Sequence, residues 1–149
     1  GPQVFSGYWN NPDETAATLL PDGWLRTGDV VTQDEDGFTT IVDRIKELII
    51  TGGFNVAPSE VEAELREHPD VADVAVVGLP ARDGGESVAA VVVLKPGATL
   101  DEPAMRAWCR ERLAAYKVPR QIVATDELPK SMLGKVVRAQ VRQRLSTTQ

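Results

Sequence analysis

The sequence predicts an α+β fold, in which a small domain of helices and strands follows a β-rich, turn-rich segment. Two runs of mostly β-branched residues, Val71 to Leu79 and Val88 to Leu94, have the length and composition of buried strands. Amphipathic helical patterns over residues 58–68 and 101–115 flank these runs. Residues 1–45, in contrast, are rich in turn formers and do not supply a complete core of their own. We therefore expect residues 1–45 to be the tail of a larger domain and residues 46–149 to form a small domain.

The first segment offers few regular elements. A short helix is expected around Glu14 to Leu20, and a strand from Phe38 to Val42. A second strand is expected from Glu47 to Thr51. The charged residues Asp43 to Lys46 are then interpreted as the connection between the two strands.

The second segment alternates helices and strands around one small sheet. Its first helix begins at Pro58, which suits the first turn, and Glu60 and Glu62 complement the positive N-terminal end of the helix dipole. Residues further along complete the pattern, with a third strand expected at Gln121 to Thr125 and a closing basic helix at Val137 to Leu145.

Composition limits the classes of function. The net charge of −6 argues against general affinity for nucleic acid or for an anionic membrane. No apolar run approaches the roughly 18 residues that span a bilayer. The lone cysteine, Cys109, cannot form an internal disulfide, which favours a reducing cytoplasm, and with a single histidine it makes a zinc site or a Cys–His catalytic pair improbable. From Tyr116 onward the sequence contains seven Lys or Arg residues and only two acidic residues. This excess of positive charge indicates either a solvated basic face or a local site for a phosphorylated ligand.

Three stretches before the sheet admit both a structural and a functional interpretation. Asp29 follows a glycine, where an aspartate usually caps a turn, but its two oxygens also suit the vicinal hydroxyls of a ribose. Asp43 to Lys46 reads, on its own, as a charged connection. In Thr51 to Asn55 the paired glycines allow positive φ, which serves a tight turn or a close approach of backbone to a ligand.

A fourth stretch, Leu128 to Arg138, places Lys135 directly after Gly134. A lysine on a glycine hinge can reach into a cleft as a mobile positive charge, or it can be a plain turn residue that enters a strand. The stretch is no P-loop, because Val136 stands where a Ser or Thr would follow the lysine.

Five stretches, taken together and in this order, are far more specific than any one of them. They are GPQVFSGYWNNP, DGWLRTGD, VDRIKELIITGGFNVAPSEVE, AAYKVPR and LPKSMLGKVVR. They resemble the C-terminal end of the acyl-adenylate-forming (AMP-binding) superfamily, and among its branches they are most similar to fatty acyl-CoA and 4-coumarate-type CoA ligases. The resemblance covers nearly the whole chain.

The resemblance implies a carboxylate-activating ligase that uses ATP, releases pyrophosphate and transfers the acyl group from AMP to coenzyme A. It implies that Asp29 binds the ribose hydroxyls of ATP and AMP and that Arg44 assists at the ribose and phosphates. Lys46 matches the hinge before a mobile C-terminal lid domain. Gly52 and Gly53 match the glycine loop that borders the pantetheine channel of CoA.

Lys135 matches the mobile catalytic lysine of adenylate formation. The physics agrees, because attack of a carboxylate on the α-phosphorus brings two anions together, and an ammonium placed there is worth several kcal/mol. The ammonium of a lysine acts as a single point charge. It can therefore serve from a loop, since it does not need the paired N–H geometry of a guanidinium.

The complete family pattern extends beyond this sequence. The phosphate loop, the glutamate expected to hold Mg²⁺ and the acyl pocket belong to the large N-terminal domain, so no metal ligand is predicted here. We expect a fragment of a cytoplasmic acyl-CoA synthetase that is inactive alone and whose partners are a fatty or aromatic carboxylic acid, ATP, CoA and the missing N-terminal domain. Two alternatives stay open: an adenylation domain of a nonribosomal peptide synthetase, and a non-catalytic binding module that kept the lid fold.

Overall fold

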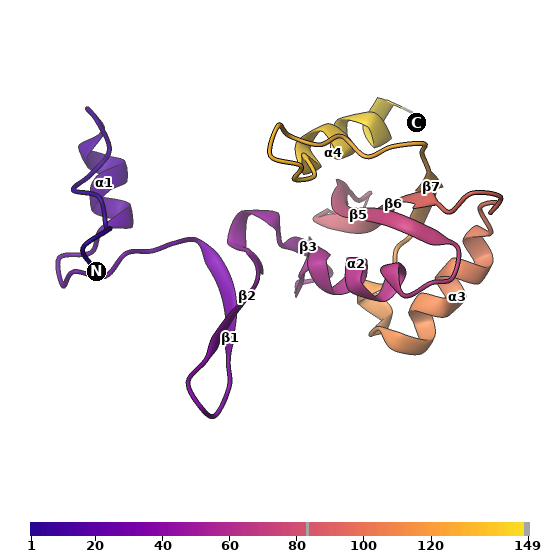
Figure 1. The fold of residues 1–149 in the computed structure, drawn as a ribbon, viewed down its shortest axis with the longest axis horizontal. Helices are drawn as coiled ribbons and strands as arrows, with labels where there is room; N and C mark the ends of the chain where they lie inside the picture. The colour runs from indigo at the N-terminus through magenta and orange to yellow at the C-terminus, as the bar shows by residue number, and fades with distance from the viewer. Residues whose placement is uncertain (83, 148–149) are drawn as a thin grey trace. The chain divides into compact units, whose positions relative to one another are not determined.

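The computed structural model describes residues 1–82 and 84–147. The chain divides into two compact units, Gly1–Lys46 and Glu47–Gln149, which are considered separately below. The prediction of an α+β fold is confirmed, since helices and small antiparallel or mixed sheets alternate along the chain (Figure 1).

The first unit holds one helix and one β-hairpin. Helix α1 spans Pro12–Thr18 and begins two residues before the predicted start, because the side chain of Asn11 caps it by accepting a hydrogen bond from the Glu14 N–H at 3.3 Å. Strands β1 (Asp29–Gln33) and β2 (Thr39–Arg44) pair antiparallel.

One strand of this unit was missed, and one sequence-based expectation is wrong. Strand β1 was not predicted, and Asp43 and Arg44 are not a connection between strands, because they form the end of β2. A short 3-10 turn, Ile45–Glu47, provides the connection instead. The cross-strand partners Asp29 and Arg44 explain the difference: pairing with the unpredicted β1 extends β2 to Arg44.

The second unit is built on a three-stranded sheet. Strand β5 (Val71–Pro80) pairs antiparallel with β6 (Glu86–Leu94), and β6 pairs parallel with β7 (Gln121–Ala124), so the order is β5-β6-β7. All three strands were predicted. The parallel step from β6 to β7 requires a long crossover, and helix α3 (Glu102–Arg112) lies in it.

A separate hairpin precedes this sheet. Strands β3 (Ile49–Thr51) and β4 (Phe54–Val56) pair antiparallel, with Thr51 opposite Phe54. Only Gly52 and Gly53 remain for the turn, and their φ values of 55° and 82° are the positive values that a type I′ turn requires. The sequence predicted the turn but not β4.

Helices cover both faces of the three-stranded sheet. Helix α2 (Pro58–Arg66) and helix α3 lie on one side, and helix α4 (Arg138–Thr147) lies on the other, as Figure 1 shows. Side chains of successive strand residues point to opposite faces, so each strand serves two cores.

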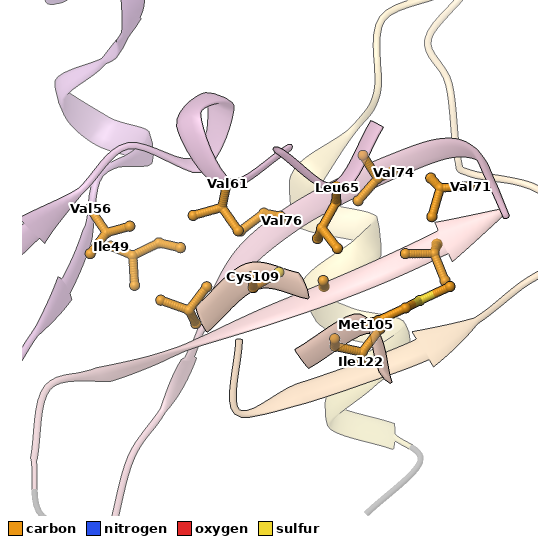
Figure 2. Packing of buried hydrophobic residues seen from close by; sticks show 13 residues of the cluster. Ile49, Val56, Val61, Leu65, Val71, Val74, Val76, Met105, Cys109 and Ile122 are labelled. Atoms are coloured by element: carbon orange, nitrogen blue, oxygen red, sulfur yellow. The ribbon is translucent and has the colours of Figure 1, made fainter. Parts of the chain in front are cut away.

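The larger core lies between the sheet, α2, α3 and the β3–β4 hairpin (Figure 2). Val74 and Val76 of β5 face Val61 and Leu65 of α2, and Met105 packs from α3. The smaller core lies under α4 and is formed by the alternate strand residues together with Leu128, Val141 and Leu145. The second unit therefore has its own continuous apolar interior.

Within the residues that the structure describes, no helix is both long and apolar enough to cross a membrane.

Candidate functional site

Asp29 and Arg44 are brought together by the β1–β2 pairing. They are cross-strand partners, and the Oδ1 of Asp29 lies 3.6 Å from the Nε of Arg44. This distance exceeds a normal hydrogen bond, and the Arg44 side chain is 71% exposed, so the pair itself adds little stability. The arrangement instead presents a carboxylate and a guanidinium side by side at one edge of a hairpin.

The turn before β1 does not use Asp29 as its cap. The Oγ1 of Thr27 accepts the hydrogen bond from the Asp29 N–H at 3.2 Å, and Gly28 adopts a φ of 75°. The structural interpretation of Asp29 as a cap or Asx-turn residue is therefore wrong. Its carboxylate is oriented by the hairpin rather than by its own turn, which leaves its oxygens available to accept hydroxyl groups.

Gly52 and Gly53 form the tip of the β3–β4 hairpin. A Cβ at either position would meet no heavy atom within 4 Å, so the positive φ, not lack of space, explains the two glycines. Beside this turn lies a hollow of about 270 Å³ whose lining includes Gly52, Phe54, Tyr116 and Arg120. The rings of Phe54 and Tyr116, both part of this lining, stack with their centroids 4.4 Å apart.

Lys135 lies on a second, smaller hairpin, the Lys130–Val136 hairpin. Lys130 and Val136 form an isolated antiparallel bridge, and the Ser131 N–H donates to the Lys135 carbonyl at 2.8 Å. Gly134 closes the turn with a φ of 75°, which favours glycine. The structure thus combines the two interpretations of Lys135, because it is a turn residue and its side chain is exposed at the hairpin.

The ammonium of Lys135 makes no hydrogen bond or ion pair with the part of the chain that the structure describes. The tip of its hairpin is also exposed to solvent: Met132 is fully exposed and Leu133 is largely exposed. An unpaired positive charge and two exposed apolar side chains therefore share one protruding turn.

The cations on either side of Lys135 are both paired. The Nζ of Lys130 lies 2.8 Å from the Oδ2 of Asp73 on β5. Burial alone would raise the pKa of the Asp73 carboxyl, but the hydrogen bonds from Lys130 and from the Val74 N–H, with the nearby positive charges, outweigh burial and lower that pKa. This ion pair ties the entering arm of the Lys130–Val136 hairpin to the sheet.

Arg138 ties the departing arm. It is the first residue of α4, and its guanidinium contacts Oε2 of Glu47 at 2.5 Å and Oε1 of Glu62 at 2.8 Å. Burial would lower the pKa of Arg138, but the two carboxylates together raise it. The sequence did not reveal this residue as part of the site.

Glu62 is the buried end of that contact. It is 5% exposed, and its Oε1 also accepts a hydrogen bond from the Val76 N–H at 2.9 Å. The expectation that Glu62 complements the helix dipole is wrong, because of the two glutamates only Glu60 lies in the first turn of α2. The Glu62 side chain points inward, to β5 and Arg138. The sequence did carry a signal for this burial: Glu62 follows Val61 of the apolar face and stands one turn before Arg66. An acidic residue next to the apolar face of a helix needs a partner if it is buried.

The predicted site residues fall into three places. Asp29 and Arg44 share the first unit, whereas Gly52–Gly53 and Lys135 belong to different hairpins of the second unit. Lys46, the predicted hinge, is the last residue of the first unit and lies in the 3-10 turn Ile45–Glu47. Among residues 1–82 and 84–147, no group of three or more His, Cys, Asp or Glu side chains is placed to hold a metal ion.

A family model, the AMP-binding enzyme C-terminal domain, matches residues 60–135, about half of the chain. The chain is 51% identical to the medium/long-chain-fatty-acid–CoA ligase FadD8 of Mycobacterium tuberculosis over 97% of its length, and 47% identical to a feruloyl-CoA synthase of Amycolatopsis over 97%. Its structure superposes on ATP-bound MatB from Rhodopseudomonas palustris with a TM-score of 0.91, at 42% identity and 97% coverage.

The chain belongs to the family of AMP-binding enzyme C-terminal domains, as its motifs predicted. It spans only about a quarter of the length of these relatives: 26% of FadD8, and 29% each of the feruloyl-CoA synthase and of MatB.

Proposed function

We propose that this chain is the C-terminal part of an AMP-forming acyl-CoA synthetase, comprising the end of the large domain (residues 1–45) and the mobile lid domain (residues 46–149). The reaction has two steps. A carboxylate oxygen attacks the α-phosphorus of ATP, forming the acyl-adenylate and releasing pyrophosphate. The thiol sulfur of CoA then attacks the acyl carbonyl, the bond to AMP breaks, and acyl-CoA and AMP leave.

One observation carries this proposal, namely the unpaired ammonium of Lys135 on a protruding hairpin whose neighbouring cations are both neutralised. A structural lysine near Asp73 or Glu62 would be expected to pair, as Lys130 and Arg138 do. An ammonium kept free suits an anion supplied from elsewhere in the protein. In the adenylation step it would stabilise the negative charge that builds on the α-phosphoryl oxygens.

Asp29 and Arg44 would hold the nucleotide. Two acceptor oxygens match two vicinal ribose hydroxyls, and the exposed guanidinium beside them can reach a phosphate. Lys46 would be the pivot by which the lid domain presents a different face in each step. The Gly52–Gly53 hairpin, with the hollow beside it, would border the pantetheine arm of CoA in the second step.

The acyl acceptor is proposed to be CoA rather than a carrier protein, since FadD8 and the feruloyl-CoA synthase carry CoA in their names. The same two relatives support a fatty or aromatic acid as substrate. The nonribosomal peptide synthetase alternative is not favoured by these relatives. The unpaired Lys135 speaks against a non-catalytic module, which would have no use for it.

Mg²⁺ would be held by residues outside this chain, where it would neutralise the phosphates of ATP. The single cysteine is buried, and burial raises its pKa to about 11, so its thiol is protected from reaction. A single cysteine allows no internal disulfide, which supports a cytoplasmic location. Without the remaining domain, the chain alone would be inactive.

An ATP–pyrophosphate exchange assay on the full-length protein tests the proposal. A panel of medium-chain, long-chain and aromatic carboxylic acids should include at least one that drives exchange, and mass spectrometry should then find the acyl-CoA product when CoA is added. Absence of exchange with every acid, in a protein shown to bind ATP, would contradict the ligase. Exchange without acyl-CoA formation would contradict the acceptor.

A further inference from the structure

We infer that Arg138 is the positioning residue for Lys135, holding the catalytic hairpin and the start of the lid domain as one rigid piece. The inference rests on the proposed function of Lys135 but concerns a different residue. It starts from a geometric need: a lysine that must reach a phosphoryl group has to be placed to within about an ångström.

The tip of the Lys130–Val136 hairpin cannot place Lys135 by its own packing. Met132 is fully exposed and Leu133 is 84% exposed, one isolated bridge joins the two arms, and only Val136, at the base, packs against the smaller core. Its orientation is therefore set where the arms join the domain. One of these anchors is the Lys130–Asp73 ion pair, whose side chains are 48% and 33% exposed.

The Arg138 anchor is better shielded from solvent. The Arg138 side chain is 24% exposed. Glu62, whose Oε1 accepts a hydrogen bond from Nη2 of Arg138, is buried and held by a backbone N–H of β5. Charge-assisted hydrogen bonds of this kind are stronger and more directional than exposed ion pairs. Arg138 lies three residues after Lys135, so a change in its position shifts the departing arm directly.

The second carboxylate gives the contact a further role. Glu47 is the first residue of the second compact unit and follows the proposed pivot, Lys46. Its Oε2 meets Nη1 of Arg138 at 2.5 Å, across 91 residues of sequence. Because Arg138 connects Glu47 to the start of α4, a rotation that begins at Lys46 would move the Lys130–Val136 hairpin together with Glu47.

Replacing Arg138 by methionine in the full-length enzyme tests the inference. We expect R138M to lower kcat of adenylate formation roughly 10- to 100-fold with little change in KM for ATP, because positioning is lost while binding is kept. Thioester formation from a supplied acyl-adenylate should change far less. Arg66→Met is the matched control, since Arg66 also donates to Glu62, at 3.2 Å, but belongs to α2 and not to the hairpin or to α4; it should leave both steps near wild type.

A double-mutant comparison separates positioning from general damage. In a Lys135→Ala background, R138M should slow adenylation no further, because there is no ammonium left to place. If R138M slows it by the same factor with and without Lys135, or slows both half-reactions equally, the inference is overturned. Should R138M fail to fold, Glu47→Gln makes the same comparison with the buried Glu62 contact intact, and it should give a smaller loss of the same kind.

The two proposals fail differently. If Lys135→Ala alone leaves adenylation intact, the proposed function fails and the inference with it. If Lys135→Ala abolishes adenylation while R138M and Glu47→Gln resemble Arg66→Met, the proposed function stands and Arg138 has no positioning role.

Discussion

Asp29 and Arg44 face each other at the open end of the β1–β2 hairpin, with carboxylate and guanidinium 3.6 Å apart. The two residues belong to different sequence motifs, and the β1–β2 pairing turns them into one acceptor–donor pair. This pair is the contribution of the first unit to the proposed nucleotide site.

Removing the negative charge of Asp29 should weaken nucleotide binding. In the full-length enzyme we expect Asp29→Asn to weaken AMP binding roughly tenfold or more, because hydrogen bonds to a charged group are worth about 1.5–3 kcal/mol each. Titration calorimetry with AMP measures the change. Asp36→Asn, in the exposed turn between β1 and β2, is the control and should bind AMP like wild type. Equal affinity in all three proteins would remove Asp29 from the nucleotide site.

Restricting the backbone at Lys46 should separate the two half-reactions. Proline fixes φ near −65°, which suits the observed 3-10 turn but prevents a large rotation there. In the full-length enzyme, Lys46→Pro should leave adenylation measurable and block acyl-CoA formation, whereas Lys46→Ala should retain both steps. Normal acyl-CoA turnover by the proline variant would show that the pivot lies elsewhere.

The two leucines Leu65 and Leu133 should differ sharply in their effect on stability. Leu65 is fully buried in the larger core, so Leu65→Ala should lower the free energy of unfolding by about 2–5 kcal/mol. Leu133 is 84% exposed, so Leu133→Ala should change it by less than about 0.5 kcal/mol. Urea denaturation followed by circular dichroism compares them. Similar losses for both would mean that the Leu133 tip is packed in solution.

The Asp73–Lys130 pair should make stability depend on pH in the acidic range. The folded-state pKa of Asp73 is lowered, so the pair stabilises the fold above the ordinary value of 3.8, and this contribution disappears as the pH falls through the lower folded-state pKa. Both side chains are partly exposed, so the effect should stay below about 1 kcal/mol.

Asp73→Asn should therefore flatten the acid limb of a plot of unfolding free energy against pH, and Lys130→Met should flatten it in part. An acid limb as steep as that of the wild type in Asp73→Asn would show that the pair is not formed in solution.

The sequence predicted those parts of the fold whose signal is local and long. Val71 to Leu79 and Val88 to Leu94 are β-branched runs of strand length, and they form β5 and β6 of the three-stranded sheet, with β6 at its centre. Helices α2, α3 and α4 were predicted from their apolar spacing and their proline or basic ends. Lys135, Asp29 and the glycine pair were found by motif.

The unpredicted parts depend on pairing between distant residues. Strand β4 has three residues and is a strand only because β3 lies opposite. Arg44 was assigned to a loop because its partner strand was not recognised. Glu62 and Arg138 lie 76 positions apart, and no local pattern connects a buried carboxylate on one helix to the first residue of another.

The central claim is that Lys135 acts in adenylate formation and not in thioester formation. The most direct measurement compares Lys135→Ala with wild type in the full-length enzyme, following acid-dependent pyrophosphate release and, separately, conversion of a supplied acyl-adenylate to acyl-CoA. We predict that the first rate falls by roughly 10²- to 10³-fold while the second stays within a few-fold of wild type. Equal loss in both steps, or no loss in the first, would contradict the account.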